Sequence, residues 1–134
     1  PNAPVFWSLM AKCNPKALER DDEEIRRWAL IMRGMAIMAP HHHQAQNRLG
    51  TILAEKKFSE LRLAKFLNAR GPQFRDQYLL MCRFLAAKAE AIDWRLLARL
   101  ILYQTRHETV AEQQRMELAR DYFRKKTSKD KAAS

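Results

Sequence analysis

The residues most able to do chemistry occur in two short runs. Three histidines occupy positions 41–43, and the acidic sequence DDEE occupies positions 21–24. Consecutive loop histidines cannot easily converge on one metal ion, and no cysteine or acidic cluster stands nearby. Four acids opening a helix match the preference for negative charge at that end, which favours a structural role over a two-metal nuclease site. Neither run therefore predicts a metal site or a catalytic site.

Other enzyme motifs are missing from the sequence. It contains no phosphate-binding glycine loop, no nucleophile elbow and no HExxH motif. We therefore expect a protein that is not an enzyme and uses no cofactor. A nuclease acting through Asp22 and Glu23 is the disfavoured alternative.

Arginine is the remaining candidate for a functional side chain. In AIDWRLLARLILY, residues 91–103, Arg95 and Arg99 lie four apart in an apolar helix, with nothing acidic nearby in the sequence that would pair with them, and Arg106 continues the stripe. Arg62 and Lys65 form a similar pair in an earlier segment. Because the guanidinium plane suits phosphate oxygens, these basic ridges predict contact with a nucleic-acid backbone. The alternative for each ridge is a solvated helix face.

The charge balance supports a polyanionic partner. The 134-residue chain has 25 Lys and Arg against 15 Asp and Glu, a net charge of +10, and fifteen of the basic residues are arginine. The excess is concentrated between residues 56 and 107, where eleven basic residues stand against four acidic ones. Ordinary solubility needs less charge than this.

The elements that would position these residues are helices. Only three glycines, no alternating strand pattern and many strong helix formers predict an all-α fold of small bundles, with about seven helices and no sheet. The expected helices occupy residues 6–12, 15–20, 22–38, about 48–56, 60–70, 74–89, 94–106 and 109–126. On the helix at 22–38, the apolar spacing predicts a buried face made of Ile25, Trp28, Ala29, Met32, Met35, Ala36 and Ala39.

Local signals mark several helix ends. Pro40 is expected to end the helix at 22–38, and Ser59 is expected to cap the helix at 60–70. Asp93 is the expected N-cap of the basic helix at 94–106, where Ile92 would pack on Leu97 as a hydrophobic staple. A capping box at 109–112 opens the last helix. Residues 127–134 are expected to fray as a polar tail.

Length and composition fit one ordinary domain or two very small ones. We expect an amino-terminal bundle at 1–55 and a carboxy-terminal bundle with a frayed basic tail at 56–134. Cys13 and Cys82 are expected to be buried free thiols in a reducing compartment. The sequence has no apolar run long enough to cross a bilayer and no signal-peptide layout, so we expect a soluble, cytoplasmic protein without membrane contact.

Three segments resemble the CasB family, the small subunit of the type I-E CRISPR Cascade complex. They are LGTILAEKKFSELRLAKFLNARG, LLMCRFLAAKAEAIDWRLLARLILY and DYFRKK, which lie between residues 49 and 126. FWSLMAKCNPKALERDD, near the amino terminus, is more loosely similar. The sharpest piece is the Ile-Asp-Trp turn with the residues that follow it, namely Ile92, Asp93, Trp94, Leu97, Ala98 and Arg99.

The resemblance implies a non-catalytic, all-helical protein with two bundles, present as a pair along the inner side of a crRNA-guided complex. It implies that basic residues hold the target DNA and the displaced non-target strand and so stabilise the R-loop. The basic positions of the family fall on Arg20, Arg62, Arg83 and Arg106, and His107 stands where the family can place another basic side chain.

The candidate nucleic-acid-binding residues combine the ridges with these positions, and they are Arg20, Lys57, Arg62, Lys65, Arg83, Arg95, Arg99 and Arg106. The expected partners are the other Cascade subunits, crRNA, target DNA, the displaced strand and a second copy of the chain. Two alternatives stay open. Some arginines can meet carboxylates on neighbouring subunits, or the whole protein can be a helical adaptor that docks an acidic protein.

Overall fold

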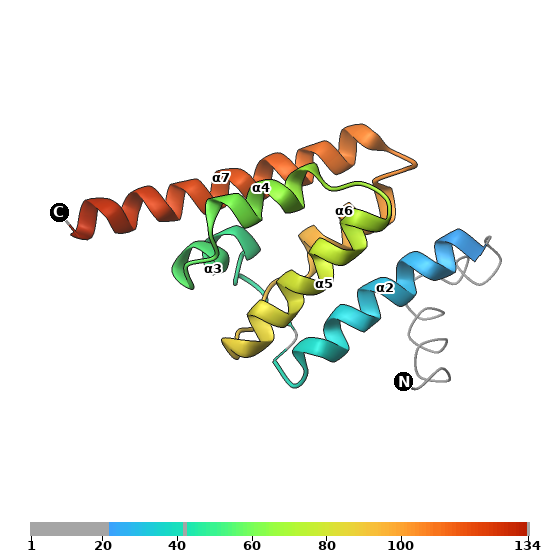
Figure 1. Cartoon of the computed structure of the whole chain (residues 1–134), viewed down its shortest axis with the longest axis horizontal. Coiled ribbons are helices and arrows are strands. Elements are labelled where there is room, and N and C mark those ends of the chain that lie inside the picture. The colour runs from blue at the N-terminus through green and yellow to red at the C-terminus, as the bar shows by residue number, and fades with distance from the viewer. Residues whose placement is uncertain (1–21, 42, 134) are drawn as a thin grey trace.

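The computed structural model describes residues 22–41 and 43–133, and the regular elements of this part are all α-helices (Figure 1). The only pairing of extended backbone in these ranges is an isolated bridge between His43 and Ile92. The all-α prediction without a sheet is thus confirmed for the described chain. The helices expected at 6–12 and 15–20 lie outside the described residues. The helices are α2 (Asp22–Met38), α3 (Leu49–Glu55), α4 (Glu60–Asn68), α5 (Pro72–Ala87), α6 (Arg95–Tyr103) and α7 (Glu108–Ala133).

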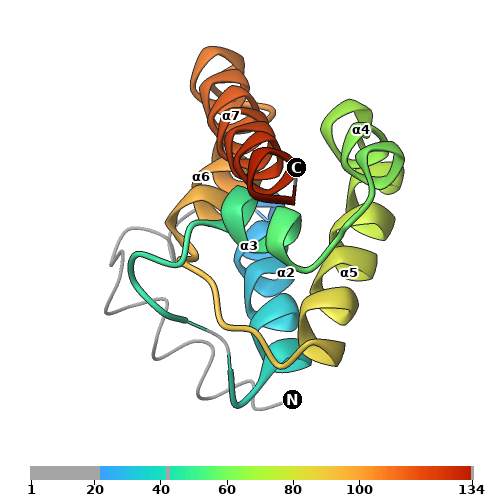
Figure 2. The ribbon, with the colours of Figure 1, turned by 90° about the vertical axis from the view of Figure 1, so that its left-hand side faces the viewer.

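The helices pack in two sets that α6 connects. α3 packs along α7, whereas α2 and α4 both pack on α5, and α6 contacts α2 and α7. Figure 2 shows α4 and α5 on one side of the molecule and α6 and α7 on the other. One hydrophobic cluster runs through all described helices. The contacts between α3 and α7 therefore join residues of the two expected bundles, 1–55 and 56–134.

The helix at 22–38 has the predicted ends, but its buried face differs from the predicted one. Ile25, Trp28, Met32 and Met35 are only half-buried, and the three alanines of the predicted face are exposed. Glu24 and Arg27 are buried and form an ion pair with each other, so polar residues do not mark the solvent-exposed side of this helix. The residues that α2 buries are Glu24, Arg27, Ile31, Gly34 and Met38.

Gly34 lets α5 approach α2 closely. A Cβ at position 34 would lie 2.0 Å from the hydroxyl oxygen of Tyr78 and 2.9 Å from the ring of Trp94. The open space allows the Tyr78 hydroxyl to donate hydrogen bonds to the carbonyl oxygens of Leu30 (2.9 Å) and Ile31 (3.3 Å). Burial raises the pKa of this hydroxyl well above its usual range. The contact fixes α2 against α5.

The helix ends follow the local signals in most places. Ser59 caps α4, because its Oγ accepts a hydrogen bond from the Arg62 backbone N–H at 3.2 Å. Asp93 lies one residue before the formal cap position of α6, yet its Oδ1 accepts from the Arg95 backbone N–H at 3.1 Å. The prediction of a frayed tail is wrong for residues 127–133, since α7 continues to Ala133. Lys129 Nζ, which donates to the carbonyl oxygen of Glu55 at 3.1 Å, ties this last segment to α3.

Candidate nucleic-acid interface

Most acidic side chains of the described residues are already bound by cations of the same chain. Of the described acids, only Asp22, Asp76 and Asp130 form no ion pair within that part of the molecule. Because the chain has ten more cations than acids, pairing leaves many basic side chains without an acid. The ion pairs are Glu23 and Glu24 with Arg27, Glu24 with Arg106, Glu55 with Lys125, Glu60 with Lys126, Glu90 with Lys56, Asp93 with Arg95, Glu108 and Glu112 with Arg115, and Glu117 and Asp121 with Arg48.

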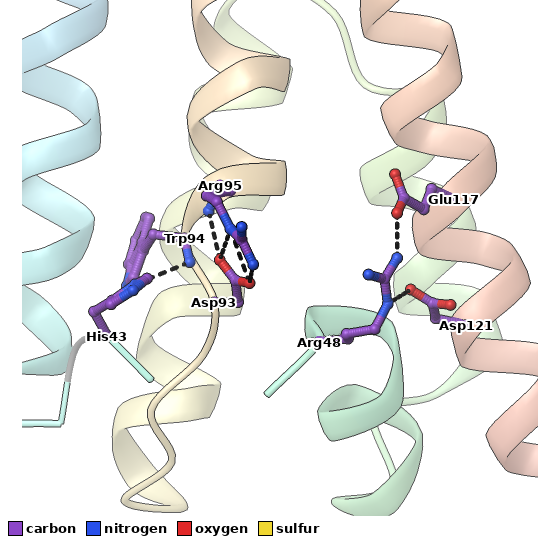
Figure 3. A network of polar contacts seen from close by, with 7 residues as sticks. All are labelled: His43, Arg48, Asp93, Trp94, Arg95, Glu117 and Asp121. Atoms are coloured by element: carbon purple, nitrogen blue, oxygen red, sulfur yellow. Dashed lines mark hydrogen bonds and ion pairs between the residues drawn. The ribbon is translucent and has the colours of Figure 1, made fainter. Parts of the chain in front are cut away.

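Arg95 is not an unpaired guanidinium. Its Nε lies 3.0 and 3.1 Å from the two carboxylate oxygens of Asp93, and its terminal Nη2 also donates to that carboxylate (Figure 3). These hydrogen bonds lower the pKa of Asp93 to about 2 and raise that of Arg95. The expectation that no nearby acid would pair with Arg95 is therefore wrong. The reason is local, because the chain before α6 turns Asp93 back onto the first residue of the helix.

Arg48 joins α3 to α7 and was not among the sequence candidates. Its Nε donates to Asp121 Oδ2 at 2.7 Å, and its Nη2 donates to Glu117 (Figure 3). Hydrogen bonding to Glu117, and next to Asp121, raises the pKa of Arg48. The residue lies immediately before α3 in the structure, and no other basic residue of the expected helix at 48–56 shared a face with it, so the sequence did not single it out. We interpret Arg48 as a structural residue.

Arg106, one of the positions matched to the family, also has an acidic partner inside the chain. Its Nη1 lies 3.0 Å from Glu24 Oε2, across a sequence separation of 82 residues. Glu24 is buried, and it also contacts Arg27, whose guanidinium donates to Thr105. Arg106 therefore links the end of α6 to the start of α2. Its side chain is still 47% exposed, so its outer edge faces solvent.

Arg62 lies over an aromatic pair between α4 and α5. Its guanidinium carbon is 6.0 Å from the centre of the Phe58 ring, and Phe58 packs edge-on against Phe84 of α5 at 4.9 Å. Lys88 lies over the other ring, with Nζ 5.6 Å from the centre of Phe84. A cation of α4 and a cation directly after α5 are thus brought to one aromatic pair. Lys88 was not among the sequence candidates.

The other described candidates are exposed and have no acidic partner. They lie after α3, on α4, on α5 and on α6, and none forms an ion pair or a side-chain hydrogen bond with a residue that the structure describes. They are Lys57, Lys65, Arg83 and Arg99. Arg20 lies outside the described residues.

The candidates that lie within helices are distributed over α4, α5 and α6. Arg62, Lys65 and Arg83 lie on α4 and α5, which contact each other. Arg95 and Arg99 lie on α6, on the opposite side of the view in Figure 2. The helices that carry these candidates therefore lie on both sides of this view.

The histidine and acidic runs have structural surroundings. His41 and His43 are exposed, and His43 Nδ1 accepts a hydrogen bond from the Trp94 backbone N–H at 3.3 Å (Figure 3). Asp22, Glu23 and Glu24 form the first turn of α2, as the helix-start interpretation predicted. Among the described residues, no three His, Cys, Asp or Glu side chains are grouped so that they could hold a metal ion. No helix in these ranges is long and apolar enough to span a membrane.

Comparison with known proteins identifies the family. The profile of the family described as CRISPR-associated protein Cse2 matches residues 1–123, which is most of the chain. No curated protein and no solved structure matches the chain. The match includes every helix described here except the end of α7, and it agrees with the resemblance to the CasB family noted from the sequence. The chain therefore belongs to the Cse2 (CasB) family and is a subunit of a type I-E Cascade complex.

Proposed function

We propose that this Cascade subunit is non-catalytic and holds the backbones of the target DNA and the displaced strand, thereby stabilising the R-loop. The observation that carries the proposal is the surplus of exposed, unpaired cations that remains after the acids of the described chain are paired. The candidate contacts without an acidic partner are Lys57, Arg62, Lys65, Arg83 and Arg99.

Unpaired cations bind phosphate better than paired ones. A guanidinium already bound to a carboxylate must share or lose that partner before it neutralises a phosphate, whereas a free one releases only counterions from the nucleic acid. Arg95 and Arg106 are therefore secondary candidates, and Arg20 is proposed from the family match alone. Backbone contacts of this kind do not depend on base sequence, which leaves target recognition to pairing with crRNA.

Association as a pair fits the separation of the basic residues. Helices that carry these cations lie on both sides of the view in Figure 2, α4 and α5 on one side and α6 on the other. A second copy beside the first would extend a basic path beyond the reach of one chain of this size. We propose such a pair within the complex, together with crRNA and the other Cascade subunits as partners.

The test uses Cascade reconstituted with a variant of this subunit in which Lys57, Arg62, Lys65, Arg83 and Arg99 are changed to Gln. Target binding is measured by filter retention, and strand opening by permanganate reactivity of displaced thymines. We expect at least a roughly tenfold loss of affinity, about 1.4 kcal/mol, and a weaker dependence on salt. Wild-type affinity in a normally assembled variant complex would contradict the proposal.

The matched control changes cations that already have acidic partners. Lys56 pairs with Glu90 (2.9 Å) and Lys125 with Glu55 (3.2 Å), and both lysine side chains are about one-third exposed. Lys56→Gln with Lys125→Gln should affect DNA binding less per charge removed. A main variant that fails to enter the complex would instead favour docking to an acidic protein. Cleavage of labelled DNA by the purified subunit with magnesium or manganese would contradict a non-catalytic role.

A further inference from the structure

The outer face of α7 carries an exposed stripe of two apolar side chains, one arginine between them and one threonine after them. The residues follow one another by four, three and four positions, a spacing that places them on one face of a helix. Met116 is 54% exposed and Phe123 45% exposed, so two large apolar side chains of this face lie at the surface. Arg124 lies beside Phe123. The residues of this stripe, called the Phe123 stripe below, are Met116, Arg120, Phe123 and Thr127.

The two arginines of this region are free of acids. Arg120 and Arg124 form no ion pair or hydrogen bond with any residue that the structure describes. The nearest acids along α7, Glu117 and Asp121, are both bound to Arg48 on the side that faces α3. The positive charge of Arg120 and Arg124 is therefore not compensated within this part of the chain.

The position of the Phe123 ring is set by its neighbour. Its ring packs edge-on against Tyr122, with 5.1 Å between the ring centres. Tyr122 is buried, and its hydroxyl donates a hydrogen bond to the carbonyl oxygen of Phe58. Phe123 thus presents an aromatic surface to solvent from a fixed base.

An exposed aromatic ring between free cations has the chemistry of a site for single-stranded nucleic acid. Base stacking on an aromatic side chain is independent of sequence, and cations beside the ring bind the flanking phosphates. A duplex cannot use the ring, because its bases are already stacked inside the helix. Met, Phe and Arg also occur in protein–protein interfaces, so the choice of a polyanion as the partner rests on the two arginines that have no acidic partner among the described residues.

We propose that the Phe123 stripe is a binding platform for single-stranded DNA, in which Phe123 stacks on an unpaired base while Arg120 and Arg124 contact the adjacent phosphates. This inference rests on the proposed function, from which it takes DNA as the partner. It goes beyond that function by naming a stacking residue and a preference for an unpaired strand. None of its residues belongs to the basic set proposed above.

The first experiment measures binding of the full chain by fluorescence anisotropy, with an oligothymidine of about 20 nucleotides and a duplex of the same length. Phe123→Leu keeps apolar area but removes the aromatic face, whereas Phe123→Trp keeps a ring. We expect Phe123→Leu to weaken single-strand binding by roughly five- to tenfold, or about 1 to 1.4 kcal/mol, and to leave duplex binding unchanged. Phe123→Trp should retain single-strand affinity. Helical circular dichroism checks that each variant is folded.

Salt dependence separates stacking from charge. Arg120→Gln with Arg124→Gln should reduce the slope of log affinity against log salt by about 1.4, because each phosphate contact to a single strand contributes about 0.7. Phe123→Leu should lower the affinity at every salt concentration without changing the slope. The two variants thus give distinguishable results for the two parts of the platform.

A spectroscopic readout keeps the proposal testable should Phe123→Leu alter the fold. The tryptophan introduced by Phe123→Trp should be quenched when oligothymidine binds, in excess of the quenching of the three native tryptophans in the wild type. A Phe123→Leu variant that binds oligothymidine as tightly as the wild type would overturn the stacking platform, and so would an introduced tryptophan that is not quenched. Either result would leave the proposed function standing. Absence of DNA binding by wild-type subunit and assembled complex would instead refute the proposed function.

Discussion

Gly50 of α3 lies directly against the backbone of α7 at Leu118. A Cβ at position 50 would be 2.4 Å from the carbonyl oxygen of Leu118 and 2.8 Å from the backbone nitrogen of Tyr122. Both helices are therefore in backbone contact at this point, and the Arg48 ion pairs with Glu117 and Asp121 lie at the same junction. The α3–α7 packing positions the Phe123 stripe relative to the rest of the fold.

Gly50→Ala should lower the free energy of unfolding by about 1 to 3 kcal/mol, since the added methyl group overpacks against backbone that cannot move aside. Helix propensity alone predicts the opposite sign, a stabilisation of up to about 1 kcal/mol for Gly→Ala inside a helix. Urea denaturation followed by circular dichroism measures the difference. A more stable variant would show that α3 and α7 are not in close contact at this position.

The Asp93–Arg95 pair should make stability depend on pH in acid. Hydrogen bonds from Arg95 hold the pKa of Asp93 at about 2, below its usual value of 3.8. As the pH falls, Asp93 of the unfolded chain is therefore protonated before Asp93 of the folded chain. The contribution of this group to the free energy of unfolding is thus present in full above about pH 4 and is lost towards about pH 2. The urea midpoints of the wild type and Asp93→Asn should differ most at about pH 5 and converge near about pH 2. A difference between the two urea midpoints that stays constant as the pH falls would contradict this assignment.

Arg99→Gln should weaken DNA binding more than Arg95→Gln, although both arginines lie on α6. Arg99 has no acidic partner in the described chain, whereas Arg95 is already bound to Asp93. For a duplex, loss of one phosphate contact reduces the salt slope by about 0.9, and we expect that change for Arg99→Gln. Binding titrations with duplex DNA at several salt concentrations measure both slopes. Equal losses of affinity and slope would show that the Asp93 pair does not restrain Arg95.

Cys82 should be unreactive in the native protein. Its side chain is fully buried in α5, and burial raises the pKa of its thiol to about 12, so almost no thiolate is present at neutral pH. In a Cys13→Ser background, which leaves Cys82 as the only thiol, labelling with a thiol reagent should be slow in buffer and fast in urea. Rapid labelling without denaturant would mean that α5 opens readily.

Local signals in the sequence were sufficient to predict the positions of most of the described helices. Pro40 and Ser59 act through backbone geometry and hydrogen bonds within a few residues of themselves, and the structure places helix ends beside both. The face of α2 could not be predicted in the same way. Its buried side includes Glu24 and Arg27, which satisfy each other, and burial of a satisfied ion pair leaves no apolar pattern to detect.

The sequence alone determined the excess of positive charge, the helical class and the resemblance to a Cascade subunit, because composition, short-range spacing and motif order are properties of the linear chain. Only the tertiary structure decided which cations are free. Arg106 meets Glu24 across 82 residues and Arg48 meets Asp121 across 73, and such pairs exist only after the helices pack. The exposure of Phe123 between unpaired arginines was decided by the same packing, since α7 buries its opposite face on α3 and α6.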